Sequence, residues 1–209
     1  EEAIKDPAVK GIWCVPKYSN PEGIIYSKDT IVRMASMKPA APDFTIMWDN
    51  AYCIHEFDGD YVEFPDILHQ CKKYGTEDRV FMFTSTSKIT FPGAGVSALA
   101  CSEAMMKYIC KRFSVMIISY DKMNQLRHVR FLKNKEGVLA HMAKHRRRLV
   151  PCFDAVKTAF NEELTPCGDI AHWTNPKGGY FISLYVMPGC AKRVAQLCIA
   201  PVYTAAFVP

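Results

Sequence analysis

The chain has 209 residues, of which 49% are hydrophobic and 22% are charged, the balance of a globular protein with a sizeable core. Its net charge of +5 is concentrated in His145-Arg146-Arg147-Arg148, a run without interleaved aromatic residues. We therefore expect a solvated helix face there and no nucleic-acid partner. Because no apolar run reaches the length of a bilayer, we also expect no membrane-spanning segment.

The nine cysteines of the chain are odd in number, and no two of them form a Cys-x-x-Cys pair. Most lie in apolar surroundings, so we expect free buried thiols in a reducing, cytoplasmic compartment, and no disulfide framework or metal site. The chain opens with Glu1 and without a signal peptide or an initiator methionine, which leads us to expect further sequence in front of it.

Short apolar runs alternate with amphipathic segments in the first half of the chain. Strands are predicted at residues 9–16, 44–48, 80–83 and 96–100. Helices are predicted at residues 30–37, 65–74 and 102–113, the first of them capped by Ser27-Lys28-Asp29. This alternation predicts an α/β layer with a mostly parallel sheet, in which ligands bind at the carboxyl ends of the strands.

The pattern changes near Lys133. A long helix is predicted at residues 135–164, where Pro151 should introduce a kink. Two strands at residues 170–173 and 180–186 and a short helix at 190–198 follow it. We therefore divide the chain into an α/β part, residues 1–132, and a smaller α+β part, residues 133–209.

Three polar residues, Asn20, Asp49 and Lys88, lie just past the ends of predicted strands, so we expect them at one edge of the sheet. Around Lys88, alternating hydroxyl residues are followed by a Pro-Gly-Ala-Gly loop at residues 92–95. Hydroxyls and loop amides make a cradle for an anion, and a lysine at the edge of a core can act as a nucleophile. The plainer interpretation is a surface loop with a solvated lysine.

Pyridoxal phosphate needs this set of groups. Its aldehyde forms a Schiff base with a lysine, and its ring nitrogen stays protonated beside a carboxylate. Its phenolate oxygen takes hydrogen bonds from tyrosine and asparagine, and its phosphate takes them from hydroxyls and backbone N–H groups.

Four short motifs carry these groups in order. They are Asn20-Pro21-Glu22-Gly23, Asp49-Asn50-Ala51-Tyr52, Ser85-Thr86-Ser87-Lys88 and Gly178-Gly179-Tyr180-Phe181. They resemble the Asn-Pro-Thr-Gly, Asp-x-x-Tyr, Ser-x-Ser-Lys and small-domain Gly-Gly motifs of class I pyridoxal-phosphate aminotransferases of fold type I. The spacing also fits, with 29 residues from Asn20 to Asp49 and 39 from Asp49 to Lys88. The resemblance covers about residues 11–201 and is strongest to a bacterial branch of aspartate aminotransferases.

The resemblance implies a role for each site residue. The catalytic residues would be Lys88, which forms the Schiff base and carries the proton, Asp49, which pairs with the pyridinium nitrogen, and Tyr52. The cofactor-binding residues would be Asn20, Asp49, Tyr52, Ser85, Ser87 and Lys88, with the two serines on the phosphate. Considered singly, Asn20 is also explained as a turn residue and Tyr52 as a core aromatic. By the same resemblance, residues 1–132 are the second part of a large cofactor-binding domain and residues 133–209 the small C-terminal domain.

The sequence departs from the family at three places. Gly95 and Val96 stand where the family has an arginine on the phosphate, and Glu22 replaces a threonine. The family's arginine for the substrate carboxylate precedes a C-terminal strand, which we place at residues 199–201. Because Cys198 precedes that strand directly, we expect a missing loop, with its arginine, between Cys198 and Ile199. The family's chains are also about twice as long, and their phosphate loop and ring-stacking aromatic lie in the half absent here.

The resemblance implies a cytoplasmic, homodimeric enzyme that transfers an amino group between an amino acid, such as aspartate or glutamate, and a 2-oxo acid. Two other functions remain open from the sequence. One is a pyridoxal-phosphate-sensing domain of a transcription regulator, and the other is a lyase or decarboxylase that uses the same cofactor. The cofactor supplies the chemistry in each case, so the motifs do not separate them.

Overall fold

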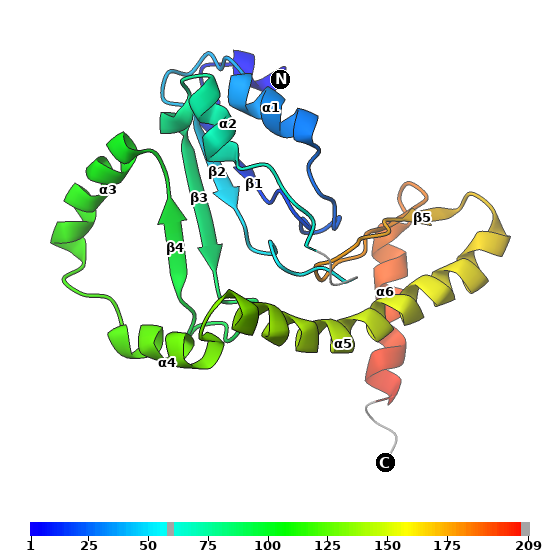
Figure 1. Cartoon of the computed structure of the whole chain (residues 1–209). Helices are drawn as coiled ribbons and strands as arrows, with labels where there is room; N and C mark the ends of the chain where they lie inside the picture. Colours follow the sequence, from blue (N-terminus) through cyan, green and yellow to red (C-terminus); the bar gives the residue numbers. More distant parts are fainter. Residues whose placement is uncertain (58–60, 206–209) are drawn as a thin grey trace.

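The computed structural model describes residues 1–57 and 61–205, with side chains up to residue 199. A four-stranded sheet with the order β1-β2-β3-β4 organises the first half of the chain (Figure 1). Its strands are β1 (Gly11–Cys14), β2 (Thr45–Asp49), β3 (Val80–Ser85) and β4 (Ser97–Ala100). The first three are parallel, which confirms the predicted mostly parallel sheet. β4 is antiparallel to β3, because the connection between them is too short for the crossover that a parallel neighbour needs.

Two helices, α1 (Lys28–Ser36) and α2 (Ile67–Lys73), pack side by side on one face of this sheet. Each begins at a side-chain cap. The Ser27 hydroxyl accepts a hydrogen bond from the Thr30 amide, and the Asp66 carboxylate accepts from the Leu68 amide. The core lies between these helices and the sheet and includes the buried residues Cys14, Ile31, Ala35, Phe44, Ile46, Trp48, Ile67, Cys71 and Val80.

The opposite face of the sheet is only partly covered. In β2, Ile46 and Trp48 point into the core. The residues that alternate with them, Thr45, Met47 and Asp49, lie on the other face and are half-buried. Trp13 of β1 lies on this second face, stacks on Phe83 and is 63% exposed. The site described below lies at the end of this partly open face.

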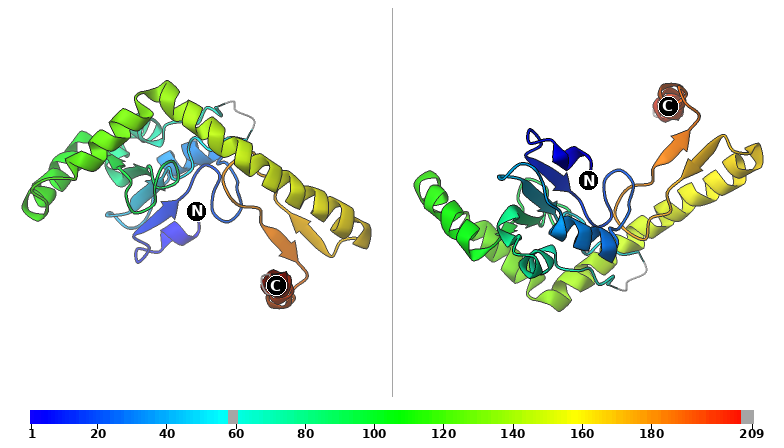
Figure 2. Two further views of the ribbon diagram at one scale, coloured as in Figure 1. Left: turned by 90° about the horizontal axis from the view of Figure 1, so that it is seen from below. Right: turned by 90° about the horizontal axis from the view of Figure 1, so that it is seen from above.

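Three helices follow the sheet, α3 (Glu103–Met116), α4 (Lys122–Leu132) and α5 (Lys135–Ala159). Figure 2 shows them along an arc on one side of the molecule. α3 has no buried residue, and α4 was not among the predicted helices. α5 continues through Pro151 as one helix, which appears bent in Figure 1, and ends in a π-helical turn at Phe160–Leu164.

The C-terminal part contains a two-stranded antiparallel sheet of β5 (Ala171–Trp173) and β6 (Leu184–Val186), followed by α6 (Ala191–Ala205). The strand predicted at residues 199–201 is wrong, since α6 runs through these positions. No turn residue separates Cys198 from Ile199, so the helix continues. The strand predicted at residues 180–186 is formed only in its second half, because Tyr180 and Phe181 pack against Tyr52 instead of pairing with another strand.

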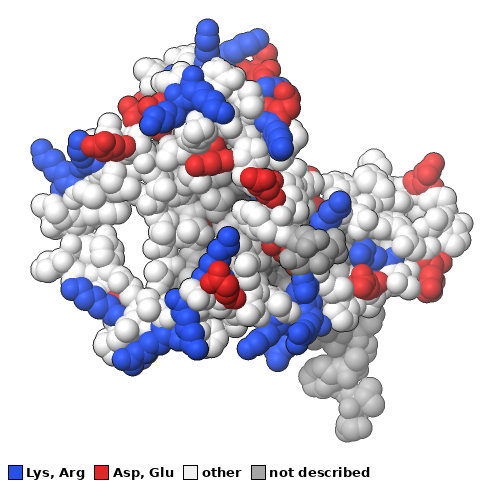
Figure 3. Space-filling view, in the orientation of Figure 1, with Lys and Arg blue, Asp and Glu red and all other residues white. Residues whose placement is uncertain are grey.

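All nine cysteines are free, but only Cys14 and Cys71 are buried and four are exposed, so the expected burial of the thiols is only partly correct. In the basic run on α5, Arg147 and Arg148 are exposed but His145 and Arg146 are half-buried, so the expected solvated helix face is only partly correct. Figure 3 shows Lys and Arg side chains along the border formed by α4 and α5. Among residues 1–57 and 61–205, no helix combines the length and apolar character needed to cross a bilayer. The division at residues 132 and 133 stays a prediction.

Candidate active site

The carboxyl ends of β1, β2 and β3 meet at one edge of the sheet, because these strands are parallel. Asp49 is the last residue of β2 and pairs in register with Phe83, two residues before Ser85 at the end of β3. Lys88 lies in the turn that follows Ser85, and Asn20 lies in the loop that follows β1. The structure therefore brings these residues to the same edge, as the sequence predicts.

The two serines form a small cradle of polar groups. Ser85 Oγ donates to Ser87 Oγ at 3.1 Å, and the Ser87 amide donates to Ser85 Oγ at 3.3 Å. The backbone of Gly95 closes one side, since a Cβ at this position would lie 3.3 Å from both the amide nitrogen and Oγ of Ser87. A side chain at position 95 would thus crowd the cradle. Hydroxyls and backbone amides in this arrangement suit an anion such as a phosphate.

Lys88 is held through its backbone. Its carbonyl oxygen accepts hydrogen bonds from Nε2 of His55 and from the hydroxyl of Tyr180, both at 3.1 Å. Its side chain is exposed at the edge of the sheet. The turn is therefore fixed while the amine remains available for reaction.

Asp49 and Tyr52 differ in their surroundings, and the charge of Asp49 acts on Tyr52. Burial raises the pKa of the half-buried Asp49 carboxyl, and hydrogen bonds from Trp13 and the Ala51 backbone oppose the rise. Tyr52 is buried, and its pKa is raised first by burial and then by the charge of Asp49. A carboxylate that is poorly solvated and lacks a full charge partner favours a cationic group beside it.

Asn20 occupies an exposed turn that docks onto the C-terminal part of the chain. Ser183 Oγ donates to the Pro21 carbonyl at 3.0 Å, and the Tyr185 hydroxyl donates to Glu22 Oε1 at 2.8 Å. The departure from the family at Glu22 thus has a structural use, since a carboxylate accepts this hydrogen bond. The predicted contact of Asn20 with a cofactor oxygen stays a prediction.

The pair Gly178-Gly179 is explained by close backbone approach. A Cβ at Gly178 would lie 2.4 Å from the His55 carbonyl oxygen and 2.5 Å from the ring of Tyr18. Gly179 has φ +81°, and its amide donates to the same carbonyl at 2.9 Å. These contacts place the following Tyr180 and Phe181 against Tyr52, with ring centroids 5.9 Å apart in both pairs.

The sequence did not point to the histidines that surround the lysine turn. His55 is 4% exposed and binds the Lys88 carbonyl, and burial lowers its pKa, so its neutral form is favoured. His128 of α4 contacts the hydroxyls of Thr86 and Thr90. His141 of α5 lies with Nε2 2.8 Å from the Ile89 carbonyl. Only His55, three residues after Tyr52, stood close enough to a motif to be found from the sequence.

A buried lysine was also missed. Lys17 is 2% exposed and forms an ion pair with Glu56. Its Nζ also donates to the carbonyl oxygens of Cys53 and Val62 at 2.9 and 3.0 Å. Two of its partners are backbone atoms, which carry no sequence signal. Because its amine is fully used, Lys17 cannot serve as the nucleophile of the site.

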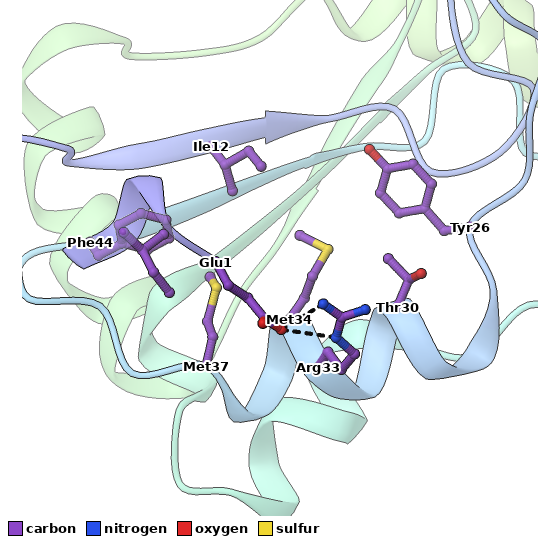
Figure 4. Close-up of a pocket in the computed structure, with 9 residues that line it drawn as sticks. Glu1, Ile12, Tyr26, Thr30, Arg33, Met34, Met37 and Phe44 are labelled. Atoms are coloured by element: carbon purple, nitrogen blue, oxygen red, sulfur yellow. Dashed lines mark hydrogen bonds and ion pairs between the residues drawn. The ribbon is translucent and has the colours of Figure 1, made fainter. Parts of the chain in front are cut away.

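A separate cavity of about 280 Å³ lies between α1 and β1, away from these residues. Figure 4 shows its mostly apolar lining, which includes Ile12, Met34 and Phe44. At its mouth the Arg33 side chain pairs with Glu1 at 2.7 Å, which lowers the pKa of that carboxyl. No predicted site residue lines it. Within the described part of the chain, no group of three or more His, Cys, Asp or Glu side chains is arranged to hold a metal ion.

Comparison with known proteins gives a consistent result. The family profile described as aspartate amino-transferase matches residues 1–203. The aspartate aminotransferase of Corynebacterium glutamicum is 44% identical over 197 residues, covering 94% of this chain and 45% of that protein. A Mycolicibacterium smegmatis protein named as an aminotransferase candidate is 47% identical over 192 residues, covering 92% of this chain and 45% of its own length.

The fold leads to the same family. The crystal structure of an aspartate transaminase from Corynebacterium glutamicum superimposes with a TM-score of 0.90 at 44% identity, over 94% of this chain and 46% of that one. The chain thus spans about half the length of the relatives that it matches. The sheet edge, its motifs and these likenesses agree, and the chain belongs to the aspartate aminotransferase family.

Proposed function

We propose that the full-length protein is a pyridoxal-phosphate-dependent aminotransferase that moves an amino group between an amino acid and a 2-oxo acid, with aspartate or glutamate as the amino acid. One observation carries the proposal. An anion cradle, a poorly solvated carboxylate and an exposed lysine amine lie at the same edge of one parallel sheet. Family membership supports the reaction type.

The residues present fit the cofactor. Ser85, Ser87 and the amide at position 87 offer donors to a phosphate, next to a glycine backbone that leaves the cradle open. A cationic neighbour, such as a protonated ring nitrogen, would stabilise the ionised form of Asp49, which burial disfavours by raising its pKa. Tyr52 lies close enough to Asp49 to feel its charge, so its hydroxyl is placed to meet an oxygen on the same ring.

In this proposal each side chain has a distinct task. When bound, the cofactor supplies an electron sink for the substrate carbon. Lys88 would hold the cofactor through Nζ, and the same amine would move the proton at the substrate carbon. Asp49 keeps the ring nitrogen protonated, Asn20 and Tyr52 orient the ring through its oxygen, and the two serines hold the phosphate.

The substrate carboxylate needs an arginine, because the planar guanidinium matches a carboxylate in two hydrogen bonds. None of the arginines among the described side chains is assigned to this role. We propose, as the sequence suggested, that it lies in a segment between Cys198 and Ile199. The structure removes one motive for this, since α6 joins these residues without a helix-to-strand change. Reading the coding sequence across this junction decides the question. A homodimer with its sites at the interface and a cytoplasmic location complete the proposal.

The first test is the position of the cofactor. Borohydride reduction of the full-length protein with bound pyridoxal phosphate, followed by peptide mass mapping, should place the pyridoxyl group on Lys88. The Lys88→Arg variant should lose the label, and the Lys177→Arg variant, altered at an exposed lysine of the Gly-Gly loop, should keep it. A label on another lysine would contradict the assignment.

Half-reactions with aspartate, glutamate and alanine identify the substrate through the change in cofactor absorbance. We expect a full change with aspartate or glutamate and release of the matching 2-oxo acid. Release of carbon dioxide or ammonia would indicate a decarboxylase or lyase instead. Binding of the cofactor without change by any amino acid would favour a sensor.

A further inference from the structure

The turn and loop that carry Lys88 are anchored mainly from outside the sheet. Residues 86–96 connect β3 to β4, and their only charged residue is Lys88. Inside the loop, the amides of Ile89 and Thr90 donate to the Thr86 carbonyl at 2.9 and 2.8 Å, which closes the turn around Lys88. The contacts that hold this turn against the sheet therefore come from neighbouring segments of the chain.

One of these neighbours, α4, has an unusual inward face. Its residues that are not exposed are Asn124, His128 and Leu132, which are spaced four apart and therefore lie on one side of the helix. Apolar side chains such as Met123 and Val129 are instead exposed, at 65% and 63%. The helix thus meets the lysine loop mostly through an amide and an imidazole, not through apolar packing.

The hydrogen bonds of His128 define its role. Nδ1 lies 2.9 Å from the Asn124 carbonyl, which can only accept, so Nδ1 carries a proton. In the neutral ring Nε2 is then an acceptor, and it lies 3.1 Å from the Thr86 hydroxyl and 2.8 Å from the Thr90 hydroxyl. Either hydroxyl can donate to its one lone pair, and Thr90 Oγ1 also lies 3.2 Å from the Thr86 carbonyl, a second acceptor for its proton. One imidazole nitrogen therefore joins the two ends of the turn that contains Lys88.

The same contacts reach the far end of the loop. Thr86 Oγ1 also accepts from the Val96 amide at 2.9 Å, and Asn124 Nδ2 donates to the Gly95 carbonyl at 3.0 Å. Gly95 is the residue whose backbone lies against Ser87 in the anion cradle. α4 thus contacts the loop on both sides of the cradle, through His128 on one side and Asn124 on the other.

We propose that His128 is a positioning residue, which rests on the proposed function: it fixes the turn so that Ser87 and Lys88 face the cofactor before it binds. The ring does not touch the cofactor in this role. It acts through Thr86 and Thr90. Because the turn is already ordered before the cofactor binds, binding does not have to supply the free energy of ordering it. Losing the imidazole removes the acceptor that Thr86 and Thr90 share, leaves Thr90 with the Thr86 carbonyl alone, and loosens the turn.

The test compares His128→Leu with His128→Gln in the full-length protein, because the glutamine amide reaches about as far as Nε2 and can accept from the same hydroxyls. His69→Leu, an exposed histidine on α2, is the matched control. In the cofactor-free protein, amide hydrogen exchange of residues 86–96 should be about tenfold faster in His128→Leu, near normal in His128→Gln and unchanged in the control. The dissociation constant of pyridoxal phosphate should rise about tenfold in His128→Leu, as expected for about one hydrogen bond.

A Thr90→Val variant, which keeps the imidazole and removes the Thr90 hydroxyl together with its bond to the Thr86 carbonyl, should show a shift in the same direction. It keeps the proposal testable if His128→Leu does not fold. Unchanged exchange in both variants would overturn the proposal, and so would faster exchange with unchanged cofactor affinity. If the unmodified protein fails to bind pyridoxal phosphate at Lys88, the proposed function itself fails, and the exchange data then report on the turn alone.

Discussion

Asp49 shows how a functional side chain can oppose the stability of its own fold. Burial raises the pKa of its carboxyl, so the folded protein holds this proton more tightly than the unfolded chain does. The contribution of Asp49 to stability is therefore greatest in acid and falls as the pH rises through the folded pKa. At neutral pH the carboxylate is a poorly solvated charge, and in the proposed function its partner is the ring nitrogen of the cofactor.

Replacing Asp49 with asparagine should therefore stabilise the cofactor-free protein relative to the parent, increasingly so as the pH rises through the pKa of the folded carboxyl. The same variant should bind pyridoxal phosphate more weakly. Denaturant titrations of both proteins at several pH values measure the first effect. Asp43→Asn is the control of opposite sign, because the hydrogen bond from Lys10 lowers the pKa of that exposed carboxyl. A difference for Asp49→Asn that shrinks as the pH rises would contradict the argument.

At the scale of elements, the two parts of the chain are joined by backbone contacts. The segment after Lys177 runs along residues 55–57, where the Phe57 amide donates to the Lys177 carbonyl at 2.9 Å. Gly178 is the point of closest approach, against the His55 carbonyl and the Tyr18 ring. A backbone atom and a buried ring cannot move aside easily, so this close packing requires a residue without a side chain at position 178.

Gly178→Ala should lower the free energy of unfolding by about 3 kcal/mol, the upper part of the range for overpacking. Gly189→Ala is a matched control, because its added Cβ meets nothing within 4 Å although its φ is +82°. It should cost about 1 kcal/mol through backbone strain alone. Chemical denaturation of the full-length variants measures both values. Equal losses would show that the close approach at Gly178 carries no energetic weight.

The sequence predicted the elements whose burial follows a simple period. β1, β2 and β3 are short apolar runs, and α1 and α2 carry their caps and apolar faces in the usual positions. α4 was missed because its inward residues, Asn124 and His128, are polar and leave no apolar stripe toward the core. The motifs located Asp49, Ser85 and Lys88, since each lies at the end of a strand or just past it. The histidines around the lysine turn were not predicted, because their partners are backbone carbonyls and hydroxyls, which no sequence pattern identifies.

On the scale of the whole molecule, much apolar surface is uncovered. Parallel sheets are normally covered on both faces, yet among residues 1–57 and 61–205 only the α1–α2 face carries a packed core and the other face is partly open. Apolar side chains are also exposed around the end of α3, with Val115 and Ile118 exposed at 86% and 104%. Figure 3 shows few charged side chains over β3 and β4. An uncovered area of this kind marks a surface that normally meets protein.

We therefore expect residues 1–209 produced alone to associate. Sedimentation velocity should show oligomers or aggregates, and a dye for apolar surfaces should bind strongly. Introducing Val115→Glu and Ile118→Lys together should shift the population toward monomers, while Lys107→Gln, on the charged part of α3, should not. A monodisperse monomer that binds no dye would contradict this expectation.

The sealed environment of Lys17 has a practical consequence for chemical labelling. Acylating reagents attack neutral amines that they can reach, and Lys17 lies behind the Glu56 ion pair and beneath the ring of Tyr61, 4.1 Å from its centroid. Its amine becomes reactive only when the loops that enclose it open, whereas Lys88 reacts from the folded state. In a timed labelling experiment on the cofactor-free protein, labelling of Lys88 therefore reports the reactivity of the reagent, and labelling of Lys17 reports how often the fold opens.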